Sequence, residues 1–119
     1  VVPGFIIQGG DLFTRSTKLT AELDRRARLT LPDEPSLIKH ERGIVSMARS
    51  DEPHSATTNF FILVGSAPHL DNTFAAFGKV TNGMEVVDAI NKMPAENEKP
   101  EKPVRITRAV VALCPAKMP

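Results

Sequence analysis

The sequence lacks the residue patterns that build disulfides, cysteine-rich metal centres and membrane-spanning helices. Its 119 residues include one cysteine, no tryptophan and no tyrosine. The single cysteine, Cys114, excludes an intrachain disulfide and a cysteine-rich metal site. No apolar run approaches the roughly 20 residues that a membrane-spanning helix needs. The formal net charge of +1 gives no electrostatic reason to expect nucleic acid or a membrane as a partner.

Motifs for familiar enzyme chemistry are also missing. There is no G-x-S-x-G elbow, phosphate loop, paired-carboxylate motif or C-x-x-C. His40, His54 and His69 lie in different segments without the spacing of metal ligands, so we expect no metal and no cofactor. Without a family resemblance, the residues predict only a β-rich globular domain.

The chain has the composition and length of one ordinary globular domain, 41% hydrophobic and 24% charged. Residues 12–42 are polar and irregular, although helix formers occur at 19–29. The rest of the chain is a series of short apolar runs separated by turn residues, which is typical of strands. We predict strands at 4–10, 43–48, 59–64, 74–80 and 104–113.

Residues 82–93 have the strongest helical pattern. Asn82 is a suitable N-cap, and Glu85 lies three residues later, as in a capping box. An apolar stripe at i, i+4 and i+7 would face a sheet; it consists of Val86, Ile90 and Met93. Pro94 ends the predicted helix.

Five segments in order resemble the motifs of cyclophilin-type peptidyl-prolyl cis/trans isomerases, especially bacterial ones. Residues 5–11 resemble F-M-x-Q-G-G-D, and residues 43–48 resemble the strand G-x-L-S-M-A. Residues 59–62 resemble the end of S-Q-F-F-I, and residues 70–80 resemble L-D-G-x-x-x-x-F-G-x-V. Residues 83–87 match the opening of the family's C-terminal helix. The five motifs together cover most of the chain.

The resemblance implies a mainly β fold, a closed antiparallel eight-stranded barrel capped by helices. Residues 1–119 would be a single cyclophilin-like domain, the C-terminal two-thirds of the family's fold, without its first strands and first helix. In this family the catalytic arginine immediately precedes the residue that matches Val1. We expect the upstream segment to exist outside this sequence; the alternative is a true fragment that cannot close its barrel and exposes strand edges.

The implied activity is rotation about the peptide bond before proline, which assists protein folding. Amide resonance creates a barrier of about 18–20 kcal/mol to this rotation. A site that lowers it must hold proline in an apolar slot and stabilise the twisted amide with a well-aimed donor. The implied partners are proline-containing peptides and unfolded proteins, the implied state is a monomer, and the compartment stays open between cytoplasm and periplasm or secretion.

The resemblance also assigns site residues. The predicted catalytic residues are Gln8, Phe5 and Phe61. Gln8 lies two places from Ile6 on one strand face, so its amide can point into the pocket. Ala48 and Arg49 resemble the segment that hydrogen-bonds the bound peptide, although a solvent-facing Arg49 side chain fits equally well. The predicted substrate-binding residues are Ile6, Ala48, Arg49, Asn59, Leu70, His69 and Phe74.

Three of these positions depart from the common family pattern. Asn59 replaces a glutamine, so its amide reaches one methylene less. His69 replaces the tryptophan of many eukaryotic members, which predicts weakened binding of cyclosporin. Phe74 replaces a common histidine.

Two alternatives to an isomerase remain open from sequence. One is a catalytically weak X-Pro peptide-binding module with the cyclophilin fold, supported by Asn59 and by the arginine position outside the sequence. The other is a structural domain without a peptide site. The retained Gln8 argues against the structural domain, because a buried amide without a partner is costly.

Overall fold

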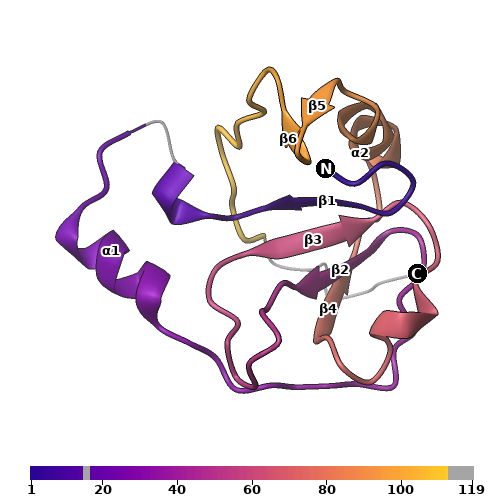
Figure 1. The fold of residues 1–119 in the computed structure, drawn as a ribbon, viewed down its shortest axis with the longest axis horizontal. Coiled ribbons are helices and arrows are strands. Elements are labelled where there is room, and N and C mark those ends of the chain that lie inside the picture. The colour runs from indigo at the N-terminus through magenta and orange to yellow at the C-terminus, as the bar shows by residue number, and fades with distance from the viewer. Residues whose placement is uncertain (15–16, 113–119) are drawn as a thin grey trace.

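The computed structural model describes residues 1–14 and 17–112. At its centre lies a four-stranded antiparallel sheet with the strand order β1-β3-β2-β4 (Figure 1). A two-stranded hairpin, two helices and two 3₁₀ turns surround this sheet. The strands are β1 (Ile6–Gly9), β2 (Ile44–Met47), β3 (Phe60–Leu63), β4 (Ala76–Lys79), β5 (Ala95–Glu96) and β6 (Lys99–Pro100). The helical elements are η1 (Leu12–Thr14), α1 (Ala21–Arg28), η2 (Pro68–Leu70) and α2 (Met84–Asn91).

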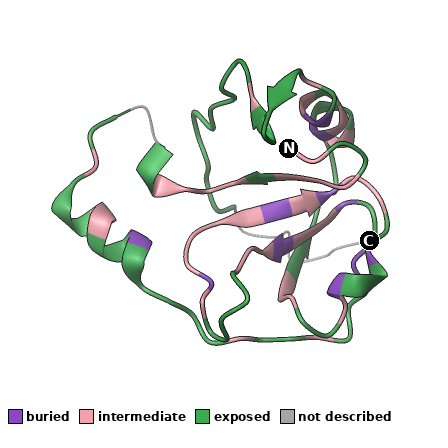
Figure 2. Cartoon of the chain, in the orientation of Figure 1, coloured by how far each residue is buried: buried purple, intermediate pink, exposed green. Residues whose placement is uncertain are grey.

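The apolar runs predict the strands of the main sheet correctly, and each strand is shorter than its run. β3 is an inner strand with alternating burial, because one of its faces meets the core. Phe61 and Leu63 point into that core, where they pack with Ala67 and Leu70. Figure 2 shows burial concentrated on the central strands, on one side of α2 and at η2.

The sheet is open in the described part of the chain. β1 and β4 lie at its two ends, and each pairs with one other strand of the sheet; an isolated bridge also joins Ile6 of β1 to Val2. A closed barrel requires hydrogen bonds that join the end strands, and β1 and β4 are separated by β3 and β2. The architecture is therefore mainly β with two helices, and the described residues do not form the predicted closed barrel of eight strands.

The predicted last strand is wrong over residues 104–112, and Leu113 lies outside the described residues. Residues 104–112 have no regular secondary structure and are exposed throughout. Ile106 and Val110 are each about two-thirds exposed, at 66% and 69%. An apolar run becomes a strand only where a neighbouring strand pairs with its backbone and a layer covers its side chains, and here it has neither.

The start of α2 also differs from its prediction. The N-cap is Gly83, in a left-handed conformation with φ 97°, and no side chain caps the helix. The capping box of Asn82 and Glu85 is therefore wrong. Val86 is 57% exposed, so the buried face of α2 instead carries Val87 and Asn91. The most buried positions are thus one residue away from the predicted stripe, of which Ile90 and Met93 are half-buried.

α1 lies away from the sheet and contacts η1 (Figure 1). Thr20 caps it by accepting a hydrogen bond from the Leu23 N–H. Its only buried residue is Ala27, and the Arg28 guanidinium lies 5.2 Å from the centre of the Phe13 ring. No helix among residues 1–14 and 17–112 is long and apolar enough to cross a membrane.

Candidate active site

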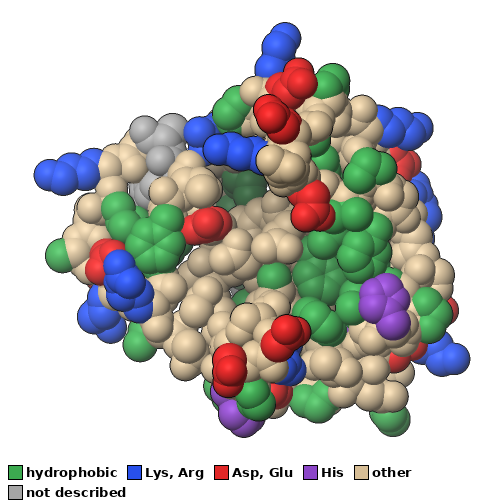
Figure 3. All heavy atoms as spheres, viewed as in Figure 1, with side chains coloured by type: hydrophobic (Ala, Val, Ile, Leu, Met, Phe, Trp, Pro, Cys, Tyr) green, Lys and Arg blue, Asp and Glu red, His purple; other side chains and the backbone are tan. Residues whose placement is uncertain are grey.

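One apolar cluster gathers most of the predicted site residues. Its buried centre includes Phe61, which is 3% exposed, and Leu70, which is 7% exposed. Partly buried predicted residues pack against this centre, namely Phe5, Ile6, Ala48 and Phe74. They come from β1, the segments beside it and the ends of two other strands, so the fold collects them from distant parts of the sequence. Figure 3 shows a hydrophobic patch with a histidine side chain at its margin, on the side of the molecule where η2 lies.

Aromatic contacts set the shape of this cluster. The Phe61 and Phe74 rings meet edge to face, with 5.8 Å between their centres and 77° between their planes. The Phe5 ring lies 5.6 Å from the ring of His69, tilted by 37°. His69 is exposed, so the Phe5 side of the cluster borders solvent. The edge-to-face geometry of Phe61 and Phe74 is one that aromatic pairs prefer.

Gln8 lies on the same face of the sheet as Phe61. Its Cα pairs with that of Phe61, and the Cα of Ile6 pairs with that of Leu63. Residues directly opposite in antiparallel strands project to the same face, so Gln8, Ile6 and Phe61 share the side that carries the cluster. Gln8 is exposed. The cost of a buried amide therefore does not argue against a purely structural domain.

Ala48, Asn59 and Arg49 form the polar border of the cluster. The Ala48 N–H donates to the Asn59 carbonyl at 3.0 Å, which leaves this N–H engaged within the protein. The Arg49 side chain is not solvent-facing, because it is only 14% exposed. It forms an ion pair with Asp33 at 3.3 Å and lies 6.0 Å from the centre of the Phe74 ring.

The Arg49 guanidinium also holds three loop carbonyls. Nε donates to Ser50 O at 3.0 Å, Nη2 to Glu52 O at 3.3 Å and Nη1 to Thr73 O at 3.4 Å. Because Thr73 precedes Phe74, this fan of contacts ties the loop after β2 to the segment that carries the Phe74 ring. Arg49 thus fastens the border of the cluster through its side chain.

Three polar side chains, connected by hydrogen bonds, pack next to Phe61. His40 is 1% exposed and Ser46 is fully buried. The His40 Nε2 lies 2.9 Å from Ser46 Oγ, and Nδ1 lies 3.2 Å from Asp71 Oδ1. An ionised carboxylate only accepts, so Nδ1 carries a proton; in the neutral ring Nε2 then accepts from the serine hydroxyl. The His40 ring stacks on Phe61 at 6.3 Å and 26°.

This Asp71–His40–Ser46 chain has the composition of a hydrolase triad but not its function. A nucleophilic serine must reach a substrate carbonyl, and Ser46 has no exposed surface. The hydrogen bonds among these three side chains instead join β2 to the segment after η2. No spacing in the sequence predicts this arrangement; the available signal was a serine in the apolar run 43–48, which needs a hydrogen-bond partner when buried.

Asp71 is held in its ionised form by His40. Its pKa lies below the ordinary value, first because the His40 backbone N–H donates to its carboxylate and then because of the His40 ring. The backbone bond is short, at 2.7 Å. Asp88 on α2 also has a lowered pKa, because the Arg42 guanidinium donates to both of its carboxylate oxygens at 2.7 Å.

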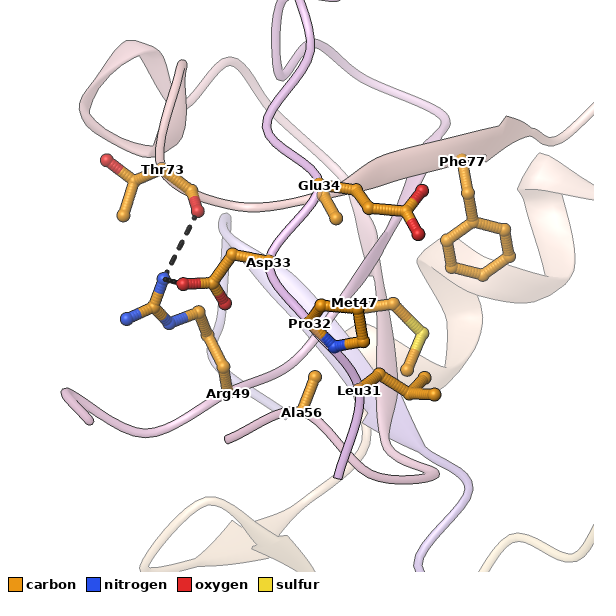
Figure 4. A pocket seen from close by; sticks show the side chains of 10 residues that line it. Leu31, Pro32, Asp33, Glu34, Met47, Arg49, Ala56, Thr73 and Phe77 are labelled. Carbon is orange, nitrogen blue, oxygen red and sulfur yellow. Dashed lines mark hydrogen bonds and ion pairs between the residues drawn. The ribbon is translucent and has the colours of Figure 1, made fainter. Parts of the chain in front are cut away.

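A separate hollow of about 200 Å³ lies outside the apolar cluster (Figure 4). Of the predicted site residues, Arg49 alone lines it. Its apolar walls include Leu31, Met47 and Phe77, and the Asp33–Arg49 ion pair lies at one side. We place the candidate site at the Phe61 cluster, because the predicted residues gather there. Among the described residues, no group of three or more His, Cys, Asp or Glu side chains is arranged to hold a metal ion.

Comparison with known proteins agrees with the family resemblance of the sequence motifs. The family model described as "Cyclophilin type peptidyl-prolyl cis-trans isomerase/CLD" matches residues 1–111. A peptidyl-prolyl cis-trans isomerase of Arabidopsis thaliana is 41% identical over 96 residues, which cover 80% of this chain and 42% of the relative. Peptidyl-prolyl cis-trans isomerase A of Dickeya dadantii is 35% identical over 125 residues, which cover 93% of this chain and 61% of the relative.

A solved structure has the same fold. The Cryptosporidium parvum cyclophilin type peptidyl-prolyl cis-trans isomerase, crystallised in the presence of the dipeptide Ala-Pro, matches with a TM-score of 0.66 and 32% identity. The match covers 84% of this chain and 63% of that one. The chain thus spans about 40 to 60% of the length of its relatives named here. The fold, the order of the motifs and these matches show that the chain belongs to the cyclophilin family of peptidyl-prolyl cis-trans isomerases.

Proposed function

We propose that this protein is a peptidyl-prolyl cis/trans isomerase that acts on X-Pro bonds and assists protein folding. The observation that carries the proposal is the Phe61 cluster. Its buried centre is bordered by partly exposed apolar side chains and by Gln8 on the same sheet face. A proline ring needs an apolar slot, and an adjacent amide can hold a substrate carbonyl. Family membership supports the same activity.

The reaction requires no covalent chemistry, so each role is one of holding. Phe61 and Leu70 form the floor of the slot, and Phe5, Ile6 and Phe74 form its walls. Gln8, exposed beside Phe61, receives the substrate carbonyl. Positioned groups favour the twisted amide when they bind it more tightly than the planar ground state. Binding a strained geometry in a preorganised apolar slot therefore lowers the rotation barrier.

The polar border supplies the remaining contacts in this proposal. Asn59 and the Ala48–Arg49 backbone hold the peptide on either side of proline, and His69 extends the slot at the Phe5 edge. We propose that the open sheet is part of an eight-stranded closed barrel in the whole protein. The proposed partners are flexible proline-containing segments of unfolded proteins, bound by a monomer, with cyclosporin as a weak competitor because His69 gives less contact than tryptophan.

NMR exchange spectroscopy on an Ala-Pro-containing peptide tests the proposal with the full chain. Uncatalysed isomerisation takes tens of seconds or more, so millisecond exchange in the presence of the protein would establish the activity. Gln8→Ala is the informative variant because Gln8 is exposed, and its substitution should leave the fold intact. The matched control is Lys79→Ala, on the exposed part of β4.

We expect wild type and Lys79→Ala to accelerate exchange equally, and Gln8→Ala to lose at least about tenfold. If the peptide shifts the protein signals near Phe5 and His69 but its own cis/trans exchange is not accelerated, the protein would instead be an X-Pro binding module. A folded protein that neither shifts nor accelerates the peptide would overturn both functions.

A further inference from the structure

A buried asparagine on α2 holds the turn that carries Phe5. Asn91 is 5% exposed and uses its whole side-chain amide. Its Oδ1 accepts from the Gly4 N–H at 3.0 Å. Its Nδ2 donates to the carbonyls of Val2 at 2.9 Å and of Ile6 at 3.0 Å. One side chain thus contacts three peptide groups of a five-residue segment.

The Val2–Ile6 segment is a tight turn closed by its own backbone. The Val2 N–H donates to Ile6 O at 2.9 Å, and the Val2 carbonyl accepts from the N–H groups of Phe5 and Ile6. Asn91 adds to this turn from outside. Its contacts with Gly4 and Ile6 lie on the two neighbours of Phe5, so the amide fixes the backbone on both sides of that residue.

The same contacts cover an edge of the main sheet. β1 is an end strand, and the Ile6 carbonyl at its start accepts from the Val2 N–H and from Asn91 Nδ2. On the other side, the Phe5 carbonyl accepts from the Val64 N–H at 2.9 Å. Phe5 is therefore held between β3 and α2, and its ring meets His69 from this fixed backbone.

We propose that Asn91 is a positioning residue for the proline slot, which acts by fixing the Val2–Ile6 turn and so the Phe5 wall. This inference rests on the proposed isomerase function. Asn91 itself lies on the buried face of α2 and acts through Phe5. A wall displaced by about 1 Å can cost on the order of 10²-fold in rate, so the amide controls activity from outside the slot.

Asn91→Asp is the sharpest variant. It preserves the shape and the acceptor for the Gly4 N–H, but an ionised carboxylate cannot donate to the Val2 and Ile6 carbonyls. Asn82→Asp is the matched control, because it makes the same change at an exposed residue just before the same helix. Asn91→Ala, which removes all three contacts without adding charge, serves if the aspartate variant fails to fold.

A double-mutant cycle with Phe5→Ala separates positioning from a general loss of stability. We expect Asn91→Asp to lower kcat/KM for an Ala-Pro peptide at least about tenfold when Phe5 is present, and less than about twofold when it is absent. Asn82→Asp should leave kcat/KM unchanged both with Phe5 and with Phe5→Ala. Equal losses on both backgrounds would overturn the proposal.

A second readout does not depend on activity. In the wild type the ring proton shifts of His69 report the Phe5 ring nearby. Asn91→Asp should shift or broaden the His69 and Phe5 ring signals, and Asn82→Asp should leave them unchanged. Unchanged ring signals in a folded Asn91→Asp protein would refute the positioning role. If the wild type proves inactive but Asn91→Asp still shifts these ring signals, the positioning of Phe5 by Asn91 would be supported and only the isomerase function would be overturned.

Discussion

His40 Nε2 and Ser46 Oγ lie 2.9 Å apart, and both residues are buried. This hydrogen bond joins the segment before β2 to the strand itself, directly behind Phe61. The His40 ring that stacks on Phe61 is therefore held by a buried hydrogen bond, which the loss of one oxygen atom, Ser46 Oγ, would remove.

Ser46→Ala should destabilise the protein by about 1–3 kcal/mol, because it leaves the buried His40 Nε2 without its donor. Urea unfolding with an unchanged slope measures the effect. Ser66→Ala, at an exposed serine next to the core residue Ala67, should change little. Equal stability of the two variants would show that the His40–Ser46 bond contributes nothing.

The lowered pKa of Asp71 predicts a pH dependence of stability. A carboxyl whose pKa is lower in the folded state stabilises the fold above its unfolded pKa of about 3.9, and this contribution is lost as the pH falls through the folded pKa. Asp71→Asn should therefore be less stable than wild type at pH 7, and the difference should shrink below about pH 4. Unfolding curves at several pH values measure it. Asp51→Asn, at an exposed aspartate, is the matched control; a constant gap between wild type and Asp71→Asn would contradict the prediction.

Arg49→Lys should loosen the border of the cluster. A single ammonium cannot reproduce the planar fan of donors to Ser50, Glu52 and Thr73. We expect a loss of about 1–3 kcal/mol and faster amide exchange in the loop of residues 50–55. Arg26→Lys is the control, because Arg26 forms an exposed pair with Glu22 and should cost less than about 0.5 kcal/mol. Similar losses would mean that the Arg49 contacts are dispensable.

Gly10 and Gly83 offer a matched test of backbone strain against close approach. Both have positive φ, 89° and 97°, so alanine at either position costs about 1–2 kcal/mol in strain. A Cβ at Gly10 would also collide with the Thr58 carbonyl, whereas one at Gly83 would meet open space. Gly10→Ala should therefore be less stable than Gly83→Ala by about 1–3 kcal/mol, measured by thermal unfolding. Equal losses would show that the Gly10 segment moves away at little cost.

The sequence predicted those parts of the fold that depend on local pattern. Short apolar runs between turn residues located the four strands of the main sheet, and a motif resemblance selected residues that the fold gathers around Phe61. The start of α2 could not be predicted, because Gly83 takes a left-handed conformation that Asn82 and Glu85 do not signal. Residues 104–112 look like a strand, but strand formation depends on a partner, and an apolar run does not encode one.

The polar supports of the site were hidden for the same reason. His40, with partners 6 and 31 residues away, and Asn91, with partners 85 to 89 residues away, look in the sequence like ordinary surface residues. Their burial and their hydrogen bonds follow from tertiary packing. The roles assigned to Gln8, Asn59 and the other site residues remain predictions for the experiments above.

The span between Asn91 and the Val2–Ile6 turn sets an order of assembly. During synthesis at about 5–20 residues per second, the residues of the turn are made roughly 4 to 17 seconds before Asn91, which holds the turn. Contacts so distant in sequence also carry the largest loop-closure cost. The Phe5 wall should thus be completed only when α2 docks, so an isomerase of this design would gain its own slot among the last events of its folding.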